Sequence, residues 1–254
     1  MTSFQITSAK ITGNPDAFSW AQVHEFKPED KEKLDLRGHL FAVIATKGGG
    51  ASGQDLRPGG GVDSVAAGRE LITRLHEEYF GNTKAAAYNA LKEAVDKVIL
   101  EFSETWGQIE IAAASFLEDV VYSAVGGGAQ AALLRDKTFV KILISNEKNS
   151  VSASGYPKPG DTFLLGTGLL FEKVEEGIIK SALESGKVEE AAETLTPIVH
   201  AGKGLGRVGA VIIKFEKSGF TLDKSIPAQK ESPGFYQEGK LIKTSGEFSK
   251  RLRT

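Results

Sequence analysis

The 254-residue chain has a formal net charge of −2 at pH 7, with 41% hydrophobic and 25% charged residues. These values are ordinary for a globular protein and include no basic excess, so nucleic acid is not an expected partner. The chain has no cysteine, which excludes disulfides, thiol nucleophiles, iron–sulfur clusters and cysteine zinc sites.

No segment reaches the roughly 18 uninterrupted apolar residues that a membrane-spanning helix needs. The first residues, MTSFQITSAK, lack the basic segment and apolar stretch of a signal peptide. We therefore expect no membrane span and a cytoplasmic location.

The first part of the chain predicts strands and then two helices. Strands are predicted at 3–12, 19–26 and 39–46, and the charged segment 27–37 is predicted to be a loop. A glycine-rich stretch at 48–61 precedes helices at 62–80 and 83–104, each with one apolar face. Asp63 or Ser64 is predicted to cap the first helix and Thr83 the second.

The second part predicts a run of short strands. These lie at 109–116, 119–125, 131–135, 138–145 and 161–167, followed by helices at 174–183 and 188–200 and a final strand at 208–217. This order predicts an α+β fold over residues 1–217, an antiparallel β-sandwich flanked by helices. The polar segment 218–254 contains two prolines and is predicted to be an extended or disordered tail.

Five segments, in order, resemble landmarks of the protein phosphatase 2C family of metal-dependent Ser/Thr phosphatases. They are NPDAF at 14–18, LFAVIA leading to GGG at 40–50, VGG and LLRD within 125–136, PGDTFLL at 159–165 and GRVGAVIIKF at 206–215. The family counterparts are Asn-Glu-Asp-Ala-Phe, the strand before Asp-Gly-x-Gly-Gly, Val-Gly-Asp with its next strand, Pro-Gly-Asp-x-Leu-Leu-Leu, and a last strand opened by Asp-Asn or Asp-Asp. The resemblance implies the family's fold over about residues 3–217.

The resemblance also implies a centre of two Mg²⁺ or Mn²⁺ ions, held by carboxylates, that activates a water to attack the phosphate. Most of these carboxylates are missing here. Thr46 and Lys47 stand at the Asp and Gly of Asp-Gly-x-Gly-Gly, Gly168 at the Asp of Thr-Asp-Gly or Ser-Asp-Gly, and Gly206 or Arg207 at the Asp of the last strand. We therefore expect neither catalytic residues nor a metal or other cofactor at these degenerate positions.

One acid of the implied metal site, Asp16, remains in place. Pro15 replaces the glutamate before it, Gly127 replaces the aspartate of Val-Gly-Asp, and Lys10 is the cation nearest to the family's phosphate-binding arginine. Carboxylates that lack their metal repel one another. We expect the Lys47 ammonium to take part of the metal's place and to pair with Asp16.

Other chemically suggestive residues carry weaker signals. Glu118, Asp119 and Asp161 fall at predicted turns, where acids commonly serve as turn and cap residues. The stretch 48–53 fits G-x-G-x-x-G, but no helix follows at once, as a dinucleotide site requires. The histidines have no zinc-type spacing and are predicted to be surface or capping residues; they are His24, His39, His76 and His200.

These observations predict a catalytically inactive phosphatase-like domain, a pseudophosphatase, that acts as a signalling or regulatory module by binding another protein. Two alternatives stay open. One is an active metal-dependent Ser/Thr protein phosphatase with rearranged ligands. The other is a nucleotide or anion binder that uses the glycine-rich loop, since backbone N–H groups can cradle phosphate.

Overall fold

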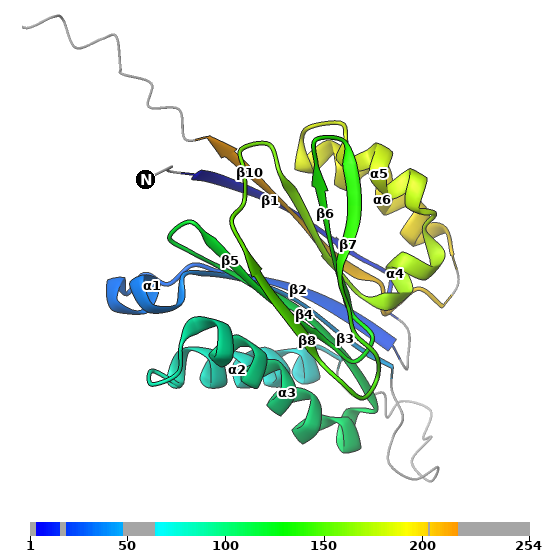
Figure 1. Ribbon diagram of the computed structural model, residues 1–254. Helices are drawn as coiled ribbons and strands as arrows, with labels where there is room; N and C mark the ends of the chain where they lie inside the picture. The colour runs from blue at the N-terminus through cyan, green and yellow to red at the C-terminus, as the bar shows by residue number, and fades with distance from the viewer. Residues whose placement is uncertain (1–3, 16–18, 48–63, 203, 218–254) are drawn as a thin grey trace, which may run out of the picture. The chain divides into compact units, whose positions relative to one another are not determined.

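The computed structural model describes residues 4–15, 19–47, 64–202 and 204–217 (Figure 1). The chain divides into two units, Met1–Ser218 and Gly219–Thr254, and all of the described residues belong to the first. The prediction that 218–254 forms a loose tail lies outside the described residues.

Two five-stranded antiparallel sheets form the centre of the first unit (Figure 1). The β1 sheet has the strand order β1 (Phe4–Thr12), β10 (Gly209–Lys217), β9 (Thr162–Gly166), β6 (Gln130–Arg135) and β7 (Thr138–Ile144). The β2 sheet has the order β2 (Ser19–Phe26), β3 (His39–Lys47), β4 (Gln108–Leu117), β5 (Val120–Gly126) and β8 (Val151–Gly155). The two sheets pack face to face around a buried core that includes Phe41, Val43 and Phe215.

Helices cover the outer face of each sheet (Figure 1). On the β2 sheet lie α2 (Ser64–Gly81) and α3 (Ala87–Trp106), and on the β1 sheet lie α4 (Gly168–Lys173), α5 (Glu176–Leu183) and α6 (Val188–Ala201). The predicted α+β sandwich is confirmed, as is the prediction that the helices near 62–80 and 83–104 pack together on one outer face.

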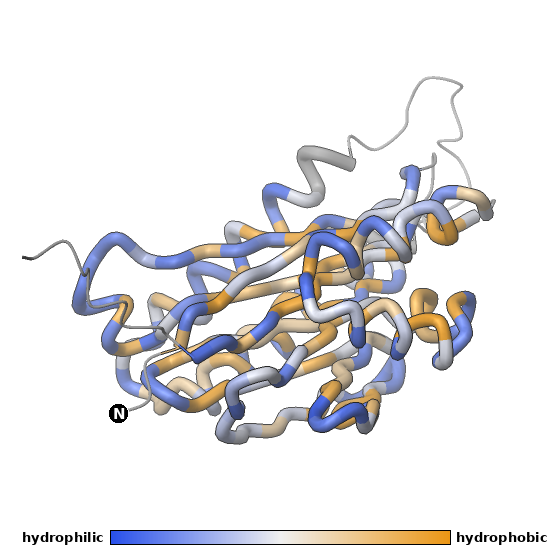
Figure 2. Tube along the Cα trace, turned by 90° about the horizontal axis from the view of Figure 1, so that it is seen from above, coloured by the Kyte–Doolittle hydropathy of each residue, from blue (hydrophilic) through white to orange (hydrophobic). Residues whose placement is uncertain are grey.

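The central strands are apolar on both faces because each face meets a packed layer. In β4, Ile109 and Ile111 pack toward α2 and α3, whereas Ala112 and Ala114 face the β1 sheet. Figure 2 shows hydrophobic residues along the strands in the interior and hydrophilic residues in the connections. Strands buried on both sides read as near-continuous apolar runs, which is why the sequence predicts them well.

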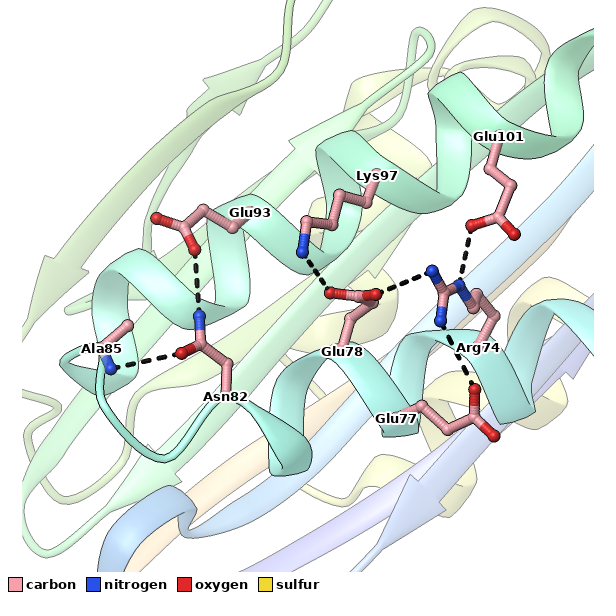
Figure 3. A network of polar contacts seen from close by, with 8 residues as sticks. All are labelled: Arg74, Glu77, Glu78, Asn82, Ala85, Glu93, Lys97 and Glu101. Carbon is pink, nitrogen blue, oxygen red and sulfur yellow. Dashed lines mark hydrogen bonds and ion pairs between the residues drawn. The ribbon is translucent and has the colours of Figure 1, made fainter.

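Polar contacts tie α2 to α3 along their solvent-facing side (Figure 3). The Arg74 guanidinium lies 2.9 Å from Glu78 on its own helix and 2.7 Å from Glu101 on α3, and Lys97 of α3 lies 2.6 Å from Glu78. These exposed pairs add to the buried apolar contacts that hold the two helices on the sheet.

Four local predictions need correction. The segment 27–37 is not all loop, because α1 (Lys31–Arg37) forms there, with the Asp30 side chain accepting a hydrogen bond from the Glu32 N–H. Thr83 does not cap α3, which starts at Ala87. The predicted helix at 174–183 is α5, and the short helix α4 that precedes it was not predicted. Strand β8 was not predicted, since its VSASG sequence has little apolar content.

No helix among the described residues combines the length and apolar character needed to cross a membrane.

Candidate functional site

The implied metal-site positions gather at one end of the sandwich. Lys47, the last residue of β3, pairs with Ser19 on β2 and with Gln108 on β4. Gly206, in the turn before β10, packs against the backbone of Ser19. Gly168, the first residue of α4, lies beside the start of β4. The structure therefore brings these sequence-predicted positions together.

Two of the predicted positions are described only in part or not at all. Asp16 and the side chain of Lys47 lie outside the described residues, so their predicted ion pair stays a prediction.

Thr46 is buried and shares the helix-facing side of β3 with Ile44. Its neighbour Ala45 therefore faces the other sheet and is the residue of β3 directed toward the site.

The charged centre of the site is Glu110, which sequence reasoning missed. It lies on β4 next to Ala45, on the face that meets the β1 sheet, and only 3% of its surface is exposed. Its Oε2 accepts a hydrogen bond of 2.6 Å from the Gly168 N–H. Its Oε1 lies 3.4 Å from Nη1 of Arg207.

Arg207 links two side chains of β4. Besides its ion pair with Glu110, its Nη1 donates to Oε1 of Gln108 at 3.3 Å. Gln108 in turn donates from Nε2 to the carbonyl of Gly127 at 3.3 Å. The resemblance implies a metal-binding aspartate at position 206 or 207. At position 207 this chain instead has an arginine, whose side chain is 18% exposed.

The environment of Glu110 has opposing effects on its protonation. Burial raises the pKa of the Glu110 carboxyl, while the Gly168 N–H and the Arg207 guanidinium favour the charged form and limit the rise. Glu110 is thus a buried acid whose charged form has two specific partners, the Gly168 N–H and the Arg207 guanidinium.

Backbone atoms have closed around the glycines that stand at acid positions. A Cβ added to Gly168 would lie 2.6 Å from the Gly128 carbonyl oxygen, and one added to Gly206 would lie 2.8 Å from the Ser19 carbonyl oxygen. At Gly127, whose φ is +70°, the Cβ would collide with the Ile109 carbonyl. Real Cβ atoms essentially never come within 3.0 Å of such atoms, so none of these positions has room for an aspartate.

The residues described here do not fit a centre of two divalent ions. Mg²⁺ and Mn²⁺ need several oxygen ligands, chiefly carboxylates. Within the described ranges the site supplies one carboxylate, Glu110, and that group is already paired with Arg207. No cluster of three or more His, Asp or Glu side chains suited to a metal occurs in that part of the chain.

The other acids named from sequence serve the fold. Glu118, with a φ of 56°, and Asp119 form the turn between β4 and β5, at the end of β4 opposite the site. Asp161 is buried, and it accepts hydrogen bonds from Nε of Arg135 at 2.9 Å and from the Lys158 N–H at 2.7 Å. It anchors the entry to β9.

The prediction that every histidine is a surface or capping residue is wrong for three of them. His24 and His76 are partly buried, with their Nε2 atoms 2.9 Å apart. His39 is partly buried, with Nε2 3.1 Å from Oε1 of Glu25. Only His200 is exposed, and its Nε2 lies 2.9 Å from the Thr12 carbonyl oxygen.

Solved structures with the same architecture are PP2C-type, or PPM-type, Ser/Thr phosphatase domains. The phosphatase PstP/Ppp of Mycobacterium tuberculosis has a TM-score of 0.57 at 16% identity, covering 84% of this chain and 99% of that one. PppA of Pseudomonas aeruginosa, a regulatory component of a type VI secretion system (T6SS), has a TM-score of 0.54 at 14% identity, covering 84% and 99%. The PPM phosphatase MsPP of Mycobacterium smegmatis, in complex with cacodylate, has a TM-score of 0.55 at 14% identity, covering 85% and 100%.

This chain therefore has the PP2C-type phosphatase fold. No family model and no curated protein matches its sequence. At these identities the likeness shows the fold alone, and function has to be argued from the site. The catalytic domain of PstP has been solved in complex with two manganese ions. In this chain, the described residues place a carboxylate–guanidinium pair, Glu110 and Arg207, at the end of the sandwich where the implied metal-site positions gather.

Proposed function

We propose that this chain is a pseudophosphatase, a PP2C-type domain that does not hydrolyse phosphate esters and acts by binding another protein. The observation that carries the proposal is the Glu110–Arg207 pair, set among glycines whose backbone leaves no space for acidic side chains.

The replacement of carboxylates by Arg207 changes the electrostatics of the site. A guanidinium 3.4 Å from the Glu110 carboxylate neutralises that carboxylate and repels an approaching divalent cation. Arg207 supplies one positive charge in a fixed place, but it cannot lower the pKa of a bound water as a divalent ion does. The pair can support the fold without supporting hydrolysis.

The loss of activity is tested with a generic aryl phosphate ester, assayed with added Mn²⁺ and with EDTA. We expect no turnover above the rate of the buffer, and calorimetry is expected to show no Mn²⁺ binding. The matched variant is Asp16→Ala, which removes the one acid that remains at an implied ligand position. Mn²⁺-dependent turnover that this variant abolishes would instead establish an active phosphatase with rearranged ligands.

The binding half of the proposal needs a separate measurement. A partner protein identified by co-purification should bind the purified chain directly, with the same affinity in Mn²⁺ and in EDTA. Asp16→Ala should leave that affinity unchanged. An interaction that required Mn²⁺ would contradict a metal-independent binding module.

A further inference from the structure

A groove lies between α5 and α6 on the outer face of the β1 sheet, where the two helices pack side by side (Figure 1). Its volume is about 490 Å³. Its lining includes Glu175, Ile178, Ser181, Ala182, Ser185 and Thr194. None of these residues belongs to the site around Glu110 and Arg207, so the groove is a separate surface of the domain.

The floor of the groove is apolar. Ala182 of α5 is buried in the same core as Ala191 and Leu195 of α6. Ile178 lies one helical turn before Ala182, on the same side of α5, and 38% of its surface is exposed. Because the fold leaves part of this isoleucine uncovered inside a groove, an apolar side chain of a ligand would remove further apolar surface from water.

The helical layer around the groove is acidic. Between positions 168 and 201 the chain has seven glutamates and three lysines, a net charge of −4, whereas the whole chain has a net charge of −2. The negative excess of the protein therefore lies in this layer. All seven glutamates are exposed; they are Glu172, Glu175, Glu176, Glu184, Glu189, Glu190 and Glu193. A ligand that complements this surface carries positive charge.

Glu175 offers a carboxylate directly in the groove. As the N-cap residue of α5 it makes no side-chain capping hydrogen bond, and it takes no part in the ion pairs of this layer among the described residues. By contrast, Glu176 lies 3.4 Å from Lys141, and Glu190 lies 2.7 Å from Lys187. The Glu175 carboxylate therefore keeps its capacity to accept hydrogen bonds from a cationic side chain of a ligand.

We propose that the groove between α5 and α6 binds a short basic segment of a partner protein. An apolar side chain of that segment packs against Ile178 and Ala182, and a Lys or Arg beside it pairs with Glu175. The surrounding glutamates attract the segment and repel phosphate-rich surfaces such as nucleic acid or an anionic membrane. The contact area is small, so the complex is weak and transient.

This inference rests on the binding half of the proposed function, for which it supplies a surface and a class of partner. It does not depend on the loss of phosphatase activity, because the groove and the Glu110–Arg207 site share no residue.

The first test is fluorescence anisotropy of the full chain with a labelled synthetic peptide in which Lys and Arg flank one Leu. We expect saturable binding that weakens as the ionic strength rises. A control peptide with Glu in place of every Lys and Arg should not bind, and one with Ser in place of the Leu should bind more weakly. No binding of the basic peptide, or equal binding of the Leu and Ser peptides, would overturn the proposal.

Variants of the protein locate the binding. Ile178→Lys removes the apolar contact and repels a basic segment, so it should weaken peptide binding by about tenfold or more. Glu175→Gln should weaken it by about threefold, as expected for one exposed ion pair. The matched controls are Leu100→Lys and Glu104→Gln, at exposed positions of α3 in the opposite helical layer. Both should bind the peptide as the unaltered chain does, and equal losses in Ile178→Lys and Leu100→Lys would contradict the assignment.

A partner protein identified by co-purification connects the groove to the proposed function. Its binding should be lost in Ile178→Lys and retained in Leu100→Lys. Retention in Ile178→Lys would overturn the groove as its docking site, and the absence of phosphatase turnover would remain a separate result. Self-association of the unaltered chain that Ile178→Lys abolishes would make a second copy the occupant, which would also overturn the proposal.

Discussion

At the scale of single residues, the missing acids have not left gaps. The backbone passes so close to Gly168 and Gly206 that a Cβ at either position would lie within 3.0 Å of a carbonyl oxygen. Overpacking of this kind forces the chain to shift and destabilises the fold. Restoring an aspartate to one of these positions therefore conflicts with the present structure.

The substitution Gly168→Asp tests this closure directly. We expect it to lower the free energy of unfolding by about 2–3 kcal/mol, because the Cβ meets the Gly128 carbonyl and the new carboxylate faces Glu110. Urea denaturation measures the loss. Gly81→Ala, at the end of α2 where a Cβ would contact nothing within 4 Å, is the control and should cost nothing. Equal stability of Gly168→Asp and the unaltered chain would show that the site is open.

Arg207→Met tests the pair that occupies the site. Without the guanidinium, Glu110 is a buried charge with one partner left, and we expect a loss of about 2–3 kcal/mol at pH 7. Burial already raises the pKa of Glu110 above its ordinary 4.5, and the substitution raises it further. A carboxyl with a raised folded-state pKa loses stability as pH rises through that value. The deficit of Arg207→Met should therefore shrink as the pH falls toward 4.5.

The double variant Glu110→Gln with Arg207→Met provides the control for this pH dependence. It removes the charge as well as its partner, so it should be more stable than Arg207→Met at pH 7. A deficit of Arg207→Met that stayed constant with pH would mean that Glu110 is not the source of the loss.

At the scale of elements, a short helix that the sequence did not predict supplies a major anchor. Arg37 ends α1 and is only 1% exposed. Its guanidinium donates to the Tyr79 carbonyl at 2.8 Å and to the Ala85 carbonyl at 3.0 Å, and it also bonds the Asn82 carbonyl. The arginine thus satisfies backbone acceptors at the end of α2 and in the connection to α3.

Arg37→Met keeps a long apolar side chain but removes these donors. We expect a loss of about 3 kcal/mol, because buried carbonyl groups are left without partners. Hydrogen exchange should become faster between the end of α2 and the start of α3. Arg69→Met, at an exposed arginine of α2, is the control. A loss no larger than that of the control would count against the anchor.

At the scale of the whole domain, two sheets and two helical layers enclose three hydrophobic cores. Three histidines are partly buried between these layers. Burial lowers the pKa of His24, of His39 and, to about 4, of His76. The ordinary value of 6.5 applies when the chain is unfolded. Below pH 6.5 these histidines therefore bind more protons in the unfolded chain than in the folded one. The free energy of unfolding then decreases as the pH is lowered.

We expect His76 to contribute about 2 kcal/mol to the loss of stability between pH 7 and pH 4. Full burial would give roughly 3.4 kcal/mol, and partial exposure reduces it. Denaturation midpoints measured across this range should fall less steeply for His76→Gln than for the unaltered chain. His200→Gln should not change the slope. Parallel curves for His76→Gln and the unaltered chain would contradict the assignment.

The sequence by itself determined the layered architecture. Apolar runs such as 39–46 and 208–217 became β3 and β10, and the apolar faces of 62–80 and 83–104 became the packed α2 and α3. Local periodicity is sufficient here because an element buried on one face has a periodic apolar pattern, and a strand buried on both faces has a continuous apolar run. Segments with little apolar content, such as α1 and β8, left no such record.

Only the tertiary structure decided what occupies the candidate site. In the sequence Glu110 is only a charge between two isoleucines and was not singled out. Its pairing with Arg207 depends on β4 and the turn before β10 meeting at one end of the sandwich. His24 and His76, separated by 52 positions, meet because α2 packs on β2. Periodicity records which face of an element is buried, but it does not record which distant side chains share that space.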